Sequence, residues 1–92
     1  MSINKIKVYV PVVASFNADG MIFPHEIIWE DGHRYHIDRV SDVRQAASMK
    51  AGGQGDRYTI WIGGHQSYLF FERSANQTGR IVGRWFVERK TA

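Results

Sequence analysis

Hydrophobic and polar residues alternate with a period of two along most of the chain, which is typical of β-strands with one buried face. In residues 5–12 every second position is isoleucine or valine, with lysine, tyrosine or proline between them. Proline cannot donate a backbone hydrogen bond to a neighbouring strand, so Pro11 should lie at a sheet edge or a bulge. The alternation predicts a first strand over residues 5–12, continuing through residues 13–16.

The same pattern predicts five further strands, separated by turn sequences. Asn17-Ala18-Asp19-Gly20, Glu30-Asp31-Gly32 and Gly63-Gly64 are typical of tight turns. Residues 45–50 favour at most one short helical stretch, and the glycine-rich residues 52–55 should form a loop. The five further expected strands cover residues 21–29, 34–43, 57–62, 66–73 and 80–89.

Six short strands without a long helix predict an all-β fold, a six-stranded antiparallel meander. With 92 residues, the chain is too short to close two cores, so we expect one compact domain over residues 1–92. Several strands are apolar on both faces, and a single open sheet would leave one of those faces in water. We therefore expect the meander to curl into a small barrel or to fold into a two-layer sheet, or a second subunit to cover it.

Composition narrows the class of protein further. Hydrophobic residues make up 43% and charged residues 23%, as in an ordinary globular protein. The absence of cysteine excludes disulfides, cysteine-bound zinc and thiol catalysis. The net charge of +3 permits an anionic partner without requiring one. No apolar run approaches the ~20 residues of a membrane helix and no secretory signal is evident, so we expect a cytoplasmic protein without membrane contact.

Arginine and aromatic residues are interleaved along the expected strands. On a small barrel such a face can bind single-stranded nucleic acid, because rings stack on bases and arginines contact phosphates. The residues predicted for this role are Arg34, Arg57, Trp61, Arg73 and Arg84. The opposing interpretation is that the rings fill the core, since Tyr58 and Trp85 are in phase with isoleucines of their own strands. Trp61 lies opposite the aliphatic stripe of its strand and is the best candidate for an exposed ring.

Metal binding and catalysis have little support in the sequence. His33 and His36 are three residues apart, which on a strand places them on opposite faces unless the turn at Gly32 bends the chain. The loop over residues 51–57 could form a weak anion-binding nest, but it lacks the Lys-Ser/Thr ending and the following helix of a phosphate loop. No nucleophile, base and acid stand in a recognisable arrangement. We therefore expect no enzyme activity, no cofactor and no metal ion.

Residues 29–43 resemble a pattern found in a family of small uncharacterised bacterial all-β proteins. The shared features are Trp29, a short glycine turn, an arginine with a tyrosine, an aliphatic residue, and Val43 beside Asp42. The similarity extends over residues 23–88. Some members of the family are encoded beside translesion-polymerase cassettes, which implies at most a DNA-linked context. The family has no assigned activity, so the resemblance implies a compact β domain and no site residues.

The expected function follows from the amount of apolar and aromatic strand surface. On a chain of this length, such strands should leave rings or strand edges exposed, and these are contact surfaces. We therefore expect a non-enzymatic β-module that mediates protein–protein contacts with a partner protein or a second copy of itself. The alternative is a nucleic-acid-binding domain that uses the arginine and aromatic residues named above.

Overall fold

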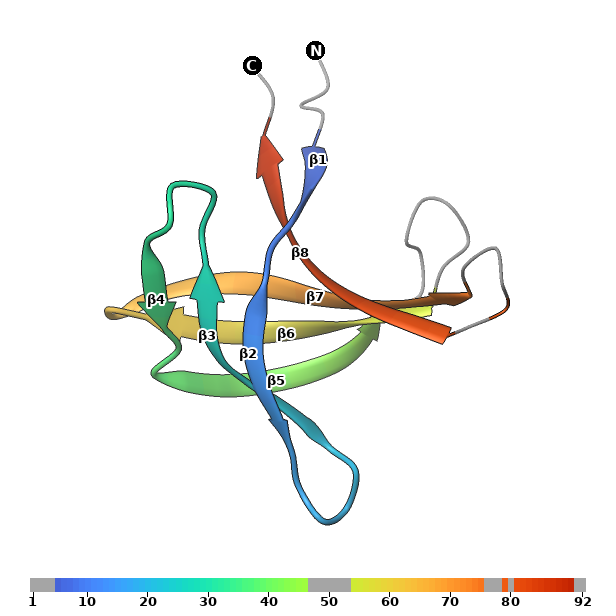
Figure 1. Cartoon of the computed structure of the whole chain (residues 1–92). Coiled ribbons are helices and arrows are strands. Elements are labelled where there is room, and N and C mark those ends of the chain that lie inside the picture. The colour runs from blue at the N-terminus through green and yellow to red at the C-terminus, as the bar shows by residue number, and fades with distance from the viewer. Residues whose placement is uncertain (1–4, 47–53, 76–78, 80, 91–92) are drawn as a thin grey trace.

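The computed structural model describes residues 5–46, 54–75, 79 and 81–90, and this part of the chain contains strands and turns but no helix (Figure 1). The strands form two antiparallel sheets, one of five strands in the order β1-β8-β7-β6-β5 and one of three strands in the order β2-β3-β4. Their bounds are β1 Lys5–Tyr9, β2 Val12–Phe16, β3 Ile22–Ile28, β4 Arg34–His36, β5 Arg39–Ala46, β6 Gln54–Ile62, β7 His65–Ala75 and β8 Ile81–Lys90.

The prediction of an all-β antiparallel fold is confirmed, whereas the six-strand count and the barrel are wrong. Eight strands are present, and the two sheets do not close into a barrel. The count differs because two of the expected strands bend at a corner. The first is divided at Val10 and Pro11, and the third is divided at Ile37 and Asp38. Each bent segment therefore contributes one edge strand to each sheet.

Backbone hydrogen bonds hold both corners. The Val10 N–H donates to the Trp85 carbonyl in the five-stranded sheet (3.0 Å), while the next residue, Pro11, accepts from the Ile28 N–H in the three-stranded sheet (3.0 Å). At the second corner, the Ile37 N–H donates to His25 in β3 and the Asp38 N–H donates to Trp61 in β6, both at 2.8 Å. Consecutive residues thus bond to different sheets, and the chain can turn without leaving these polar groups unpaired.

The predicted helical stretch over residues 45–50 is a strand where the structure describes it. Gln45 and Ala46 pair with Asp56 and Gly55 as the end of β5, and residues 47–50 lie outside the described residues. Gln54 and Gly55, expected in a loop, begin β6. Pairing with the neighbouring strands therefore overrides the local helix preference of this segment.

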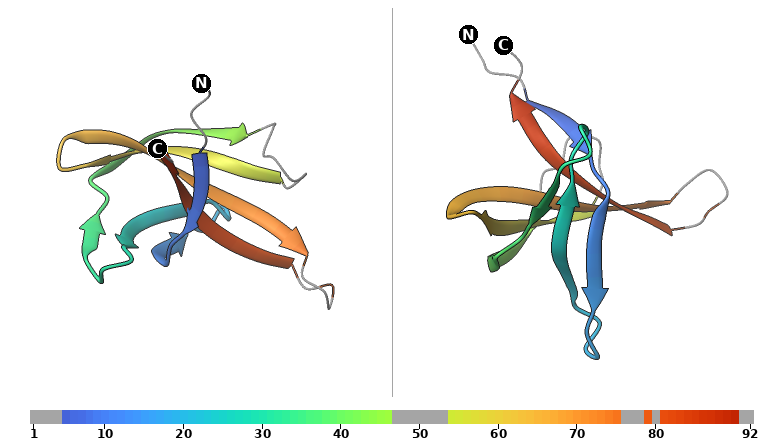
Figure 2. Two further views of the ribbon diagram at one scale, coloured as in Figure 1. Left: turned by 90° about the horizontal axis from the view of Figure 1, so that it is seen from above. Right: turned by 60° about the vertical axis from the view of Figure 1, so that its left-hand side comes forward.

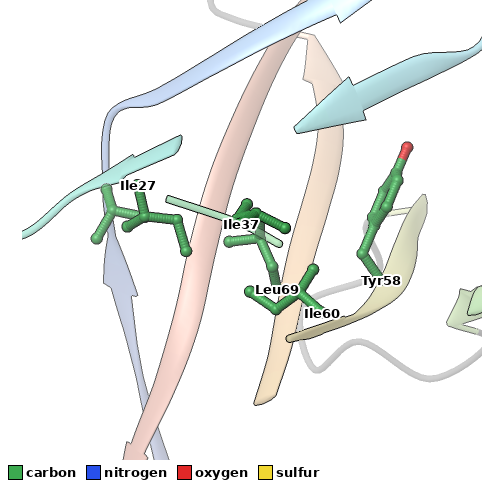
Figure 3. Close-up of a cluster of buried hydrophobic side chains, with 6 residues drawn as sticks. Ile27, Ile37, Tyr58, Ile60 and Leu69 are labelled. Carbon is green, nitrogen blue, oxygen red and sulfur yellow. The ribbon is translucent and has the colours of Figure 1, made fainter. Parts of the chain in front are cut away.

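The core lies between the two sheets. Figure 3 shows its buried side chains, which come from both corners, from β3 and from the centre of the five-stranded sheet. Tyr58 and Ile60 are both buried on the same face, as their phase in the sequence predicts. The members of the core are Val10, Ile27, Ile37, Tyr58, Ile60 and Leu69.

One glycine is required by close packing on the inner side of the five-stranded sheet. The ring of Phe71 in β7 lies against Gly83 in β8, where an added Cβ would overlap the ring and approach its Cε1 atom to 2.8 Å. The same ring packs against Trp85, with ring centroids 4.8 Å apart. A side chain at position 83 would therefore displace Phe71 from Trp85.

We expect Gly83→Ala to lower the free energy of unfolding by about 1–3 kcal/mol, as overpacking does. At an unhindered strand position the same change should instead be favourable, by roughly 0.5–1 kcal/mol. Denaturant unfolding measures the difference. In a Phe71→Ala background the Gly83→Ala change should cost much less, and an equal cost in both backgrounds would show that the ring does not occupy this space.

Candidate binding surfaces

The outer face is the side of the five-stranded sheet that points away from the three-stranded sheet. Directly paired residues of antiparallel strands share a face, so the register assigns each side chain. Because Tyr58, Ile60 and Leu69 point into the core, their chain neighbours point outward. The outer face carries Lys7 and Tyr9 of β1, Arg39, Asp42 and Arg44 of β5, Arg57, Thr59 and Trp61 of β6, Tyr68, Phe70 and Glu72 of β7, and Arg84, Phe86 and Glu88 of β8.

Cations lie over aromatic rings across this whole face. Each contact places a positive group within the distance at which the ring quadrupole attracts it. The distances from cation to ring centroid are 4.8 Å for Lys7 on Phe86, 4.9 Å for Arg39 on Trp61, 4.7 Å for Arg57 on Tyr68 and 4.2 Å for Arg84 on Tyr9.

On the β1 and β8 side of the outer face, two cations pair with one buried carboxylate. Glu72 is only 7% exposed. It accepts hydrogen bonds from the Lys7 ammonium at 2.9 Å, from the Tyr9 hydroxyl at 3.2 Å and from the Arg84 guanidinium at 3.4 Å. Both cations near Glu72 are therefore already paired within the protein, so this part of the face is a closed structural network.

These contacts lower the pKa of Glu72. The hydrogen bond from Lys7 has the largest effect, and Tyr9 and the charge of Arg84 act in the same direction, while burial opposes them. A carboxyl whose folded pKa lies below its unfolded value stabilises the fold above that unfolded value. The stabilisation disappears as the pH falls through the folded pKa, so it acts at neutral pH and is lost in acid.

We expect Glu72→Gln to lower the free energy of unfolding at pH 7 by about 1.5–3 kcal/mol, the range for hydrogen bonds to a charged group. At a pH below both pKa values the wild type and the variant should converge, because Glu72 is then protonated. Denaturant unfolding at several pH values tests this. Glu30→Gln is the matched control, since among the described residues the salt bridge of Glu30 is to the exposed Arg89 at 3.5 Å. A wild-type-to-variant difference that does not change with pH would contradict the assignment.

On the β5 and β6 side of the outer face, two arginines lack a carboxylate partner. Within the described residues, neither Arg39 nor Arg57 forms a salt bridge, whereas Arg44 pairs with Asp42 at 2.7 Å. The Nε atom of Arg57 is buried and finds no hydrogen-bond acceptor there. Arg44 is the direct cross-strand neighbour of Arg57, so two like charges adjoin on this side.

The residues that the sequence predicted for nucleic-acid binding are divided by the fold. Arg57, Trp61 and Arg84 lie on the same outer face, with Arg84 two strands away from the other two. Arg34 lies on β4 in the other sheet and bonds Glu26, and Arg73 projects from the opposite face of β7 toward Asp56 at 3.6 Å. Trp61 is half-buried rather than fully exposed, and its indole N–H donates to the Ser41 hydroxyl at 3.2 Å.

Sequence reasoning missed Arg39 and Tyr68 on this face. Both contact residues from other strands, Trp61 and Arg57 respectively. The alternation in β7 already placed Tyr68 beside Phe70 and Glu72, but only the strand register shows which arginine faces it. A correct assignment of the β5–β6 and β6–β7 hairpin registers would have identified both residues.

The second candidate surface is the edge of the three-stranded sheet formed by β2. Exposed edge strands are usually protected from pairing with another chain by charged side chains, or they are very short. Strand β1 carries two lysines, β5 carries Arg39, Asp42 and Arg44, and β4 has only three residues. Strand β2 reads Val-Val-Ala-Ser-Phe and has no charged residue. In the described part of the chain it is therefore the one edge longer than three residues that carries no charge, and its register with β3 shifts between Val13 and Ala14.

The hydrogen bonds at the two ends of β2 show which of its backbone groups point toward β3. The Pro11 carbonyl accepts from the Ile28 N–H in β3, and the Asn17 N–H donates to the Met21 carbonyl in the turn. The register shift between Val13 and Ala14 skips His25 of β3 and no residue of β2, so bonding alternates along the whole of β2. Odd-numbered residues therefore face β3 and even-numbered ones face away. Within the described residues, no hydrogen bond uses the outward N–H and C=O groups of Val12, Ala14 and Phe16.

The hairpin of β2 and β3 also projects beyond the five-stranded sheet, as Figure 1 and the right view of Figure 2 show. Its turn is held by the Asn17 side chain, which accepts from the N–H groups of Asp19 (3.0 Å) and Met21 (2.9 Å), and Gly20 takes a positive φ of 82° there. The predicted turn is thus confirmed. Phe16 is 72% exposed, and Met21 at the end of the turn is also exposed. The hairpin therefore presents apolar side chains to solvent.

Two of the four histidines make local polar contacts. His33 pairs with Asp31 at 2.9 Å, and His25 lies 2.7 Å from the Ser15 hydroxyl. In the described ranges, no three histidine, aspartate or glutamate side chains are placed to hold one metal ion. The same ranges contain no helix long and apolar enough to cross a membrane.

Comparison with known proteins gives no match to a family model, to a characterised protein or to a solved structure. The resemblance of residues 29–43 to small bacterial β-domain proteins therefore stays a prediction. The two surfaces described above have to be interpreted from their own geometry.

Proposed function

We propose that this chain is a non-enzymatic β-module of the cytoplasm that makes protein–protein contacts by strand addition at β2. The observation that carries the proposal is the uncharged edge, with the outward N–H and C=O groups of Val12, Ala14 and Phe16 unpaired in the described part of the structure. An extended segment that pairs with such an edge gains main-chain hydrogen bonds and contacts with alternate side chains.

A second copy of the chain is the partner that this edge fits directly. If two β2 strands pair antiparallel about Ala14, then Val12 of one copy lies opposite Phe16 of the other. All three outward residues of each copy then fall in hydrogen-bonded positions, because they are symmetric about Ala14. Two three-stranded sheets would merge into one of six strands. A contact of this kind is isologous and closes at a dimer.

The side chains support the same arrangement. Phe16 is largely exposed in the single chain, while Val12 is half-buried beside the core. Pairing about Ala14 places the ring of each Phe16 next to Val12 of the other copy, which removes apolar surface from water. No charge of β2 opposes the approach, since the strand has none. The contact is small, so we expect association in the micromolar range or weaker.

Sedimentation velocity over a range of concentrations tests the proposal. The mass should rise from that of the monomer toward twice that value. Ala14→Pro should keep the protein monomeric, because it removes an N–H that faces away from β3. Ala14→Ser is the matched control, since it keeps the N–H and should associate as the wild type does. Circular dichroism must show that both variants fold.

Two results would overturn the proposal. One is a wild-type protein that stays monomeric up to about millimolar concentration, which would show that two copies do not pair at β2. The other is association of folded Ala14→Pro at the wild-type strength, which would place the contact elsewhere on the molecule.

A further inference from the structure

A part of the outer face separate from β2 has the composition of a ligand site. The Arg–ring patch consists of Arg39, Arg57, Trp61 and Tyr68. Arg39 lies over Trp61 at 4.9 Å, and Arg57 lies over Tyr68 at 4.7 Å. Trp61 and Arg57 are on the same strand with one outward residue, Thr59, between them, and the other two residues come from the strands on either side. The patch therefore extends over three adjacent strands.

The charges of this patch are available to a ligand. Among the described residues, no carboxylate forms a salt bridge with either arginine. This distinguishes them from Lys7 and Arg84, which are both bonded to Glu72 on the same face. The adjacent Arg44 is paired with Asp42 at 2.7 Å, so the uncompensated charge of the patch is that of Arg39 and Arg57. An anion at Arg57 would find a guanidinium that has no salt-bridge partner among the described residues.

The rings restrict the kind of anion. Tyr68 is exposed and Trp61 is half-exposed, so flat groups can reach the patch. Guanidinium planes and aromatic rings both stack on unpaired bases, while the guanidinium charge contacts phosphates. A duplex offers this surface only its phosphates, because its bases are stacked inside. An acidic peptide offers charge without a series of planar rings.

We propose that the Arg–ring patch binds single-stranded nucleic acid, independently of the contacts proposed for β2. Neighbouring strands are about 4.8 Å apart, and Arg57 and Trp61 are about 13 Å apart along β6. The patch therefore accommodates a short run of nucleotides with phosphates at Arg39 and Arg57. Recognition depends on stacking and charge, so binding does not select a sequence.

Fluorescence anisotropy with an oligothymidylate of about twenty nucleotides tests the proposal. Binding should weaken with salt at a slope of log K against log salt near −0.7 for each phosphate contact, hence about −1.4 for two arginines. Arg57→Gln should reduce this slope by about 0.7. Tyr68→Ala should weaken binding about 5- to 100-fold and leave the slope unchanged, because a stacked ring carries no charge.

Matched controls separate this site from charge alone. Arg73→Gln makes the same charge change on the opposite face of the sheet and should leave binding as in the wild type. Ala14→Pro should also bind normally, which keeps this test independent of the β2 contact. Undetectable binding at low ionic strength, equal losses in Arg57→Gln and Arg73→Gln, or equally tight binding of polyglutamate would each overturn the proposal.

Discussion

Replacing Phe86 by alanine should lower the free energy of unfolding by about 3–5 kcal/mol, as for a core ring. Phe86 is only 2% exposed although it points away from the core between the sheets. The ring of Phe70 stacks on it at 4.9 Å, Tyr9 meets it edge-on at 5.8 Å, and the Lys7 ammonium lies above it at 4.8 Å. Loss of the ring would leave a cavity that these neighbours cannot fill.

Denaturant unfolding measures this loss, and the control is Tyr68→Ala on the same face. Tyr68 is exposed, so its removal should cost less than about 1 kcal/mol. Equal effects at the two positions would mean that the outer face does not enclose Phe86. Phe86→Leu should have an intermediate effect, because leucine fills part of the space.

Leu69→Ala should lower the free energy of unfolding by about 3–5 kcal/mol, through the inner core. Leu69 is fully buried in the cluster between the sheets (Figure 3). The substitution opens a cavity where residues of both sheets and both corners meet, so little of the space can collapse. The control is Val43→Ala, an exposed aliphatic residue on the edge strand β5, which should change stability by less than about 1 kcal/mol.

Thermal and denaturant unfolding of the Leu69 and Val43 variants should therefore differ clearly. A loss at position 69 as small as that at position 43 would mean that the three-stranded sheet does not cover this face. The core of the fold would then have to lie elsewhere.

The alternation of residue types predicted which side chains share a face, but it did not show where the strands bend. Tyr58 and Ile60 are buried together, as their phase indicates. The corner at Ile37 and Asp38 left an ambiguous signal, because Val40 and Val43 break the alternation of Tyr35 and Ile37, which indicates a bulge or a strand end without showing which. Pro11 marked the other corner, although an edge or a bulge would have explained it equally well. The number of strands therefore depends on the pairing between distant segments, which the alternation of residue types does not show.

The outer face was predictable only in part. Phe86 is in phase with Arg84 and Glu88, so its pattern favours exposure, yet side chains from β1 and β7 cover it. Glu72 bonds Lys7, which is 65 residues away in the sequence. Glu72 also bonds Arg84 on the neighbouring strand, whereas Arg57 forms no salt bridge among the described residues. The sequence pattern did not distinguish these two arginines, because only the register of β7 and β8 places Glu72 opposite Arg84.

The proposed association needs an uncovered edge at β2, and amide hydrogen exchange of the dilute monomer measures that edge residue by residue. Exchange should be fast at Val12, Ala14 and Phe16, and slow at Val13 and Ser15, whose N–H groups face β3. At higher concentration the three fast amides should become protected as two copies pair. Protection of Val12, Ala14 and Phe16 already in the monomer would contradict the account, because the edge would then be covered by the chain itself.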